Sequence, residues 1–267
     1  MSDRRCHTTS TVDRPDSRRC AKANVPCQRF PSSGVLAGNL DLDLRAFRNA
    51  LSSVGSGYVV SYIVDSTKKE NGRHCQYGSG PNWQGGLITL CTCRHDIRAR
   101  YDCDLWRGNW IAGFTCVGGY ERGNSLVYLM RVQKAFESHV ELWDWLPDKT
   151  RNAKAAHINR HGDVFRPRAP LSDLRTGQQF EPGTYEPPCD DHPHSLPAKW
   201  HKDINKIKRA ALLVGDPHFS FVWSKPMLAY SSPDNHPHPR AKGKIGGRTL
   251  IEFLSELAVW GSISPVR

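Results

Sequence analysis

The stretch Leu126–Phe136, LVYLMRVQKAF, decides the fold because its two-residue period predicts a strong β-strand. Arg131 and Gln133 lie on one face of this strand. The opposite face carries the apolar side chains Leu126, Tyr128, Met130, Val132 and Phe136. A strand that buries one face so consistently belongs to a sheet with a packed core.

Further strands are predicted on both sides of this stretch. GYVVSYIVD (57–65) and NWIAGFTCV (109–117) alternate in the same way, and LITLCT (87–92) is nearly continuously apolar. AALLVGDPHFSFVW (210–223) restores the pattern after a long loop-rich region. Because the links between the earlier strands are short, the pattern favours an α+β fold with a mainly antiparallel, curled sheet and small helices at its ends.

Two helices carry a recognisable N-terminal signature. Ser138 is followed three residues later by Glu141, and Thr249 is followed in the same way by Glu252. This spacing allows the two side chains to cap the first turn reciprocally. Pro147 ends the first of these helices.

Residues 1–53 are predicted to form a basic, largely disordered tail, with one short amphipathic helix at residues 40–51. The formal net charge of +11 favours a polyanionic partner, either nucleic acid or an anionic membrane surface. The chain has neither an apolar run long enough to span a bilayer nor an apolar N-terminal signal. We therefore expect a cytoplasmic protein with no membrane partner.

Nine scattered cysteines indicate thiols rather than a disulfide framework. Cys91 and Cys93 stand one residue apart in CTCRHDIR (91–98), with no second pair at zinc-finger distance. We expect both to end a core strand as mostly buried thiols, and we predict no metal. The residues after them predict a short basic helix.

Four polar residues of the loop-rich region are candidates for acid–base chemistry: His161, Asp163, His192 and His194. Each has a structural alternative. The histidines of DDHPHS (190–195) are more typical of a solvated loop, and Asp163 is equally suited to accepting backbone amides in a turn. No GxSxG elbow, phosphate-binding loop, dinucleotide fingerprint or HExxH motif is present, which argues against the common enzyme classes.

Four stretches within residues 57–230 are TLCTCRHDIR, GNWIAGF, LVYLMRV and HGDVF. Together they resemble a family found in bacteria and phages, the second of the nucleotide modification associated domain families. Their layout also resembles, more distantly, PUA-like barrels of the EVE and ASCH kind. This resemblance implies one curled PUA-like β-barrel domain at residues 54–262, associated with DNA base modification.

The resemblance implies a nucleic-acid-associated module that recognises a modified or flipped nucleotide, with DNA as the expected partner. The predicted pocket residues are Thr92, Arg98, Trp110 and Asp163, and the loop tryptophans Trp83 and Trp200 are predicted to contact bases. The alternative is an enzyme that acts on a nucleotide or base through the aspartate and histidine candidates. A third possibility is a protein that binds a protein partner only.

Overall fold

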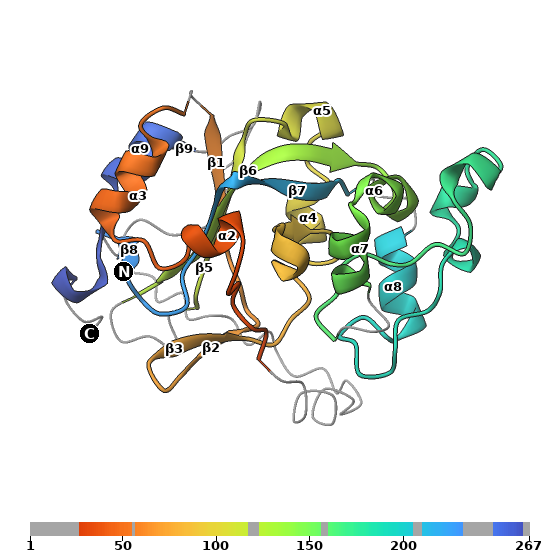
Figure 1. Cartoon of the computed structure of the whole chain (residues 1–267), viewed down its shortest axis with the longest axis horizontal. Coiled ribbons are helices and arrows are strands. Elements are labelled where there is room, and N and C mark those ends of the chain that lie inside the picture. Colours follow the sequence, from red (N-terminus) through yellow and green to blue (C-terminus); the bar gives the residue numbers. More distant parts are fainter. Residues whose placement is uncertain are drawn as a thin grey trace, which may run out of the picture.

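The computed structural model describes residues 27–54, 57–116, 123–155, 160–204, 210–231 and 248–263. Its centre is a six-stranded mixed sheet in the order β4-β7-β6-β5-β1-β9 (Figure 1). The strands of this sheet are β1 (Tyr58–Ile63), β4 (Thr89–Leu90), β5 (Trp110–Phe114), β6 (Leu126–Phe136), β7 (Leu212–Val222) and β9 (Arg248–Thr249). Two small antiparallel pairs are β2 (Thr67–Glu70) with β3 (Arg73–Gln76), and β8 (Leu228–Tyr230) with β10 (Leu257–Val259).

Short helices surround the sheet. The α-helices are α2 (Val35–Gly38), α3 (Leu44–Leu51), α4 (His95–Arg98), α5 (Cys103–Trp106), α6 (His139–Trp145), α7 (Asp148–Lys154), α8 (Pro197–Ile204) and α9 (Leu250–Ser255). The 3₁₀ turns are η1 (Gln84–Gly86), η3 (Leu171–Asp173), η4 (Gln178–Phe180), η5 (Pro182–Thr184) and η7 (Trp260–Ser262). Helices α3 and α9 lie at one end of the sheet and α6, α7 and α8 at the other (Figure 1).

The predicted closed PUA-like barrel is wrong, because the described strands form a mixed sheet whose two edges do not pair with each other. β1 pairs with β5 in parallel, Val60 opposite Ile111, and residues 64–109 form the crossover between them. A parallel pair needs such a long connection, and this one contains β4, which joins the far edge of the sheet instead of pairing with β1. Among the described residues, the edge strands β4 and β9 each pair with one strand of the sheet.

The antiparallel part of the prediction is confirmed around β6, which pairs with β5 on one side and β7 on the other. Tyr128 and Met130 of β6 face one core cluster, and Leu129 faces the other. Leu126 was expected on the same face as Tyr128, yet it joins the cluster of Leu129. The cause is a register shift in the β5–β6 pairing between Gly113 and Phe114.

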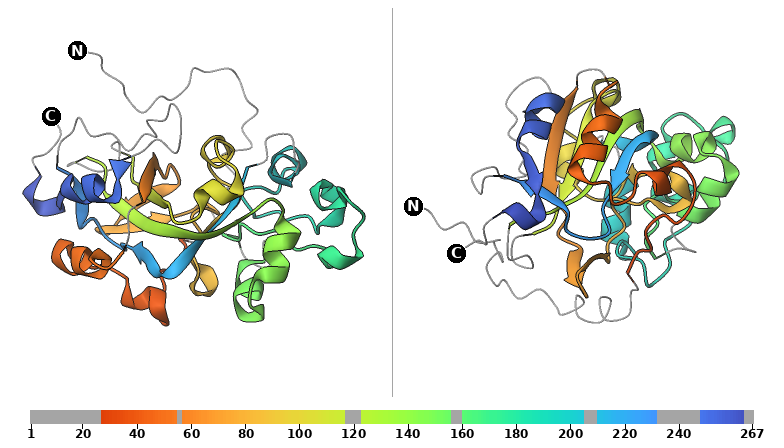
Figure 2. Two further views of the ribbon diagram at one scale, coloured as in Figure 1. Left: turned by 90° about the horizontal axis from the view of Figure 1, so that it is seen from above. Right: turned by 60° about the vertical axis from the view of Figure 1, so that its left-hand side comes forward.

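Both faces of the sheet are covered. The first cluster joins the sheet to Leu36 of α2, Ile97 of α4 and Trp106 of α5. The second joins it to Phe47 of α3 and Phe253 of α9. The views in Figure 2 show these helices arranged around the twisted sheet.

The N-terminal helix predicted at residues 40–51 is present as α3, and its side chains enter the core. The Phe47 ring lies 5.0 Å from Phe221 and 5.1 Å from Trp223 in edge-on contacts. Residues 27–54 are thus packed on the sheet rather than separate from it, while residues 1–26 of the predicted tail lie outside the described residues. Burial of the apolar stripe of α3 accounts for this docking.

Both predicted capping boxes are confirmed at the starts of α6 and α9. The strand expected over 87–92 is reduced to Thr89–Leu90, because the chain turns immediately afterwards. In the part of the chain that the structure describes, no helix is long and apolar enough to cross a bilayer.

Candidate functional site

The candidate site is built on the turn that joins β4 to α4. Arg94 adopts the left-handed conformation, with φ 54°, and ends the strand direction before α4 begins at His95. The buried Arg98 guanidinium fixes this turn, since its Nε donates to the Cys93 carbonyl at 2.8 Å and its Nη1 to the Ala211 carbonyl at 2.8 Å. The backbone of Cys93 is therefore anchored to the segment that enters β7.

Cys93 contacts a histidine and an aspartate from a distant part of the chain. Its thiol is hydrogen-bonded to the His194 side chain. The Nδ1 atom of His194 lies 2.6 Å from Oδ2 of Asp203, which belongs to α8. This order of thiol, imidazole and carboxylate is the one that activates a nucleophile through a base held by a third group.

The two titrating groups are shifted in opposite directions. Burial acts to raise the pKa of Cys93, but the hydrogen bond to His194 and the charge of that ring outweigh it, so the pKa is lowered. Burial acts to lower the pKa of His194, while hydrogen bonds to Asp203 and Cys93 raise it to about 9. A lowered thiol pKa and a raised imidazole pKa both favour transfer of the thiol proton to the imidazole.

The carboxylate of Asp203 is the more deeply buried partner of His194. Cys93 is half-buried, the His194 side chain is 17% exposed, and the Asp203 side chain is 5% exposed. The carboxylate that orients the imidazole is thus largely shielded from water. Low dielectric around Asp203 strengthens its interaction with His194.

A hydroxyl and a glycine complete the surroundings of the sulfur. The Ser79 Oγ atom lies 3.6 Å from Cys93 Sγ and 2.8 Å from Thr92 Oγ1. Gly80 packs so closely that a Cβ atom there would lie 3.0 Å from Cys93 Cβ. The sulfur thus has a hydroxyl donor beside it and little room to move.

Asp163, predicted as a pocket residue or general base, lies in a separate buried network. Its Oδ1 accepts from Thr89 Oγ1 at 2.7 Å, and its Oδ2 accepts from the Cys91 amide at 3.1 Å. Lys154 Nζ donates to the same Thr89 hydroxyl at 3.0 Å and to Asn82 Oδ1 at 2.9 Å. Both charged side chains are fully buried, so this network fixes the end of β4 beneath the Cys93 turn.

The other acid–base candidates are engaged with backbone. His161 Nδ1 lies 3.3 Å from the Gly78 carbonyl. His192 contacts the Gly162 carbonyl through Nε2, and burial lowers its pKa to about 4. His192 is therefore neutral at physiological pH, and of the three predicted histidines His194 is the one that meets the thiol.

The predicted nucleotide-contact residues are not gathered in one place. Thr92 and Arg98 flank Cys93, whereas Trp110 is fully buried in the second core cluster. Trp83 and Trp200, expected to be loop side chains that contact bases, are 2% and 7% exposed. Trp83 stacks on Phe30 at 4.9 Å and Trp200 packs on Phe165, and their large rings are used as core.

Cys93 and Asp203 are the site residues that the sequence did not identify. The available signal was a cysteine between a core strand and a short helix, with histidines far along the chain. No group of three or more histidine, cysteine, aspartate or glutamate side chains suited to a metal occurs among the described residues. Comparisons with family models, curated proteins and solved structures give no match to this chain.

Proposed function

We propose that this protein is a cysteine-dependent enzyme of the acyl-transfer class, in which Cys93 is the nucleophile, His194 the acid–base group and Asp203 the group that orients it. The observation that carries the proposal is the contact of Cys93 with His194, with His194 held in turn by Asp203. A buried thiol with only a packing role would have a raised pKa. Cys91, two residues away, is fully buried and has a raised pKa for this reason, with the charge of Asp163 adding to the burial.

The proposed reaction needs no group beyond these side chains, the substrate and water. The Cys93 thiolate attacks the carbonyl carbon of an amide or ester, and the C=O π electrons move to oxygen as the S–C bond forms. When the carbonyl re-forms, the C–N or C–O bond breaks and the leaving group takes the proton of His194. A thioester on Cys93 results.

The second half of the cycle returns the enzyme to its starting state. Neutral His194 removes a proton from water, which attacks the thioester carbonyl. Collapse of the adduct breaks the C–S bond, releases the carboxylic acid and restores the thiolate beside imidazolium. An amine in place of water would give acyl transfer rather than hydrolysis.

The test is selective alkylation at about pH 6.5, where an ordinary thiol is about 1% ionised. Intact protein is treated with limiting iodoacetamide, digested, and the label on each cysteine is quantified by mass spectrometry. We expect Cys93 to be labelled about tenfold or more faster than Cys103, whose pKa burial raises to about 11. His194→Ala should abolish this preference, whereas Cys91→Ser should leave it unchanged.

A second readout addresses catalysis itself. Incubation with p-nitrophenyl acetate should release a burst of p-nitrophenol and leave an acetyl group on Cys93. Cys93→Ser should lose both signals. Labelling of Cys93 at the rate of Cys103, together with no burst, would overturn the proposal.

The prediction that the protein recognises a modified or flipped nucleotide stays a prediction. Its support is the formal net charge of +11, which favours a polyanion, and binding would then weaken steeply with salt. A cytoplasmic location likewise stays a prediction, and a reducing compartment would protect the Cys93 thiol from oxidation. Six of the described cysteines are free thiols, whereas Cys116 is disulfide-bonded, so the expectation that the cysteines are thiols does not hold at that position.

A further inference from the structure

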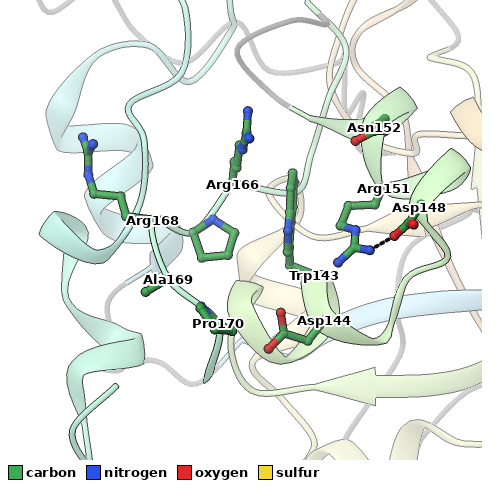
Figure 3. Close-up of a pocket in the computed structure, with 10 residues that line it drawn as sticks. Trp143, Asp144, Asp148, Arg151, Asn152, Arg166, Arg168, Ala169 and Pro170 are labelled. Atoms are coloured by element: carbon green, nitrogen blue, oxygen red, sulfur yellow. Dashed lines mark hydrogen bonds and ion pairs between the residues drawn. The ribbon is translucent and has the colours of Figure 1, made fainter. Parts of the chain in front are cut away.

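A surface cavity of about 380 Å³ lies between α6, α7 and the extended segment 166–170 (Figure 3). It is distinct from the Cys93 site, and its lining combines one tryptophan with three arginines. The lining residues are Trp143, Asp144, Asp148, Arg151, Asn152, Arg166, Pro167, Arg168, Ala169 and Pro170. Its volume falls in the range typical of small-ligand sites.

The Trp143 ring lines this cavity. The Arg151 guanidinium carbon lies 5.9 Å from the centre of the ring, and Asp148 pairs with the same guanidinium. In the view of Figure 3, Arg166 and Arg168 lie on the side of the Trp143 ring opposite to Arg151. A half-buried indole with a cation on one side is a stacking platform for a flat ring on the other.

On the side of the Trp143 ring opposite to Arg151, two guanidinium groups are available to an anion. Arg168 is exposed, and within the described residues its side chain makes no hydrogen bond or ion pair. Arg166 is 51% exposed, and its Nε lies 3.7 Å from Glu186, a long contact that solvent screens. The Asp144 carboxylate, which also lines the cavity, accepts a hydrogen bond from the Leu171 amide at 3.0 Å.

We infer that this cavity binds a nucleotide, with the base stacked on Trp143 and the phosphate held by Arg166 and Arg168. Guanidinium forks match phosphate oxygens in geometry and charge, and an indole face accepts any base. Neither the stacking of the base nor the binding of the phosphate involves Cys93, so the inference does not depend on the proposed enzyme activity. The nucleotide can be free or part of a single-stranded nucleic acid, since both present the same base and phosphate.

The test is fluorescence anisotropy with a fluorescein-labelled single-stranded oligo(dT), with AMP and inorganic phosphate as unlabelled competitors. The full chain is used, at several salt concentrations. Arg166→Glu/Arg168→Glu is compared with Arg29→Glu/Arg73→Glu, which changes the total charge equally at two exposed positions outside the cavity. Trp143→Ala is compared with Trp143→Phe, which keeps an aromatic face.

We expect Arg166→Glu/Arg168→Glu, the cavity pair, to weaken oligonucleotide binding about tenfold or more. The slope of log affinity against log salt concentration should fall by about 0.7 for each phosphate that the protein no longer neutralises. Trp143→Ala should weaken binding about 5- to 150-fold, and Trp143→Phe should retain most of it. Competition by AMP but not by phosphate identifies the single nucleotide as the ligand. Competition by unlabelled oligonucleotide alone identifies the strand.

Two results would overturn the inference. One is an equal loss of binding in the cavity pair and the control pair, which would mean that binding follows overall charge. The other is no binding of oligonucleotide or AMP by the wild-type protein at low salt. Circular dichroism and thermal unfolding of each variant establish that the substitutions leave the fold intact.

Discussion

Replacing Asp203 with asparagine removes the charge that keeps His194 protonated while preserving the size of the side chain. Asp203 Oδ2 lies 2.6 Å from His194 Nδ1, and its side chain is only 5% exposed. The amide of asparagine can still fill the space, but it cannot stabilise an imidazolium as a carboxylate does. We therefore expect the pKa of His194 to fall towards its ordinary value.

The structure gives the size of this effect. Against the opposing effect of burial, hydrogen bonds to Asp203 and Cys93 raise the pKa of His194 from 6.5 to about 9. A rise of this size corresponds to about 3 kcal/mol of preferential interaction with the charged ring. Because the folded state binds this proton more tightly than the unfolded state, the stabilisation is complete below about pH 6.5 and is lost as the pH rises through about 9.

Urea unfolding under reducing conditions at about pH 6 and pH 10 measures this contribution. Between the two pH values, the wild-type protein should lose about 2–3 kcal/mol more unfolding free energy than Asp203→Asn does. The matched control is Asp203→Asn in a His194→Ala background, where the substitution should have no pH-dependent effect. If wild type and Asp203→Asn lose the same amount, Asp203 does not hold an imidazolium and the assignment of its role fails.

Two further predictions concern the support of the Cys93 turn. Lys154→Met should cost about 3–5 kcal/mol of unfolding free energy because it leaves the buried Asp163 carboxylate without its cation, and adding Asp163→Asn should recover part of this loss. Additive losses in urea titrations of the single and double variants would contradict this coupling. Gly80→Ala should slow alkylation of Cys93 by about tenfold or more, because the new Cβ would lie 3.3 Å from the sulfur. Gly183→Ala, whose Cβ would meet nothing within 4 Å, is the control, and equal alkylation rates in the two variants would refute the argument.

The strands and helix starts could be predicted from local patterns. The two-residue period of 126–136 predicted β6, and the spacing of Ser138 and Glu141 predicted the start of α6. These signals are local, because a strand face and a capping box each depend on residues within a few positions of one another. The pairing of β1 with β5 could not be obtained in this way, since it depends on where a crossover of residues 64–109 returns.

The candidate site likewise has features that local sequence signals indicated and features that depend on the tertiary structure. His194 was identified because it lies in a loop with paired histidines. The sequence did not identify the residues that it contacts. Cys93 was expected to be a mostly buried thiol, and its sequence neighbours did not single out the base that it contacts. Asp163 was a candidate both for the pocket and for acid–base chemistry, yet its carboxylate is directed into a buried network with Thr89.

The sequence by itself determined the alternation of buried and exposed positions, the helix caps, the basic character of the chain and the supply of thiols and imidazoles. Tertiary structure alone decided that a thiol at position 93, an imidazole at 194 and a carboxylate at 203 meet. The physical reason is that the strength of a hydrogen bond or a charge interaction depends on separation in space and on burial. Neither quantity is encoded in the distance between residues along the chain.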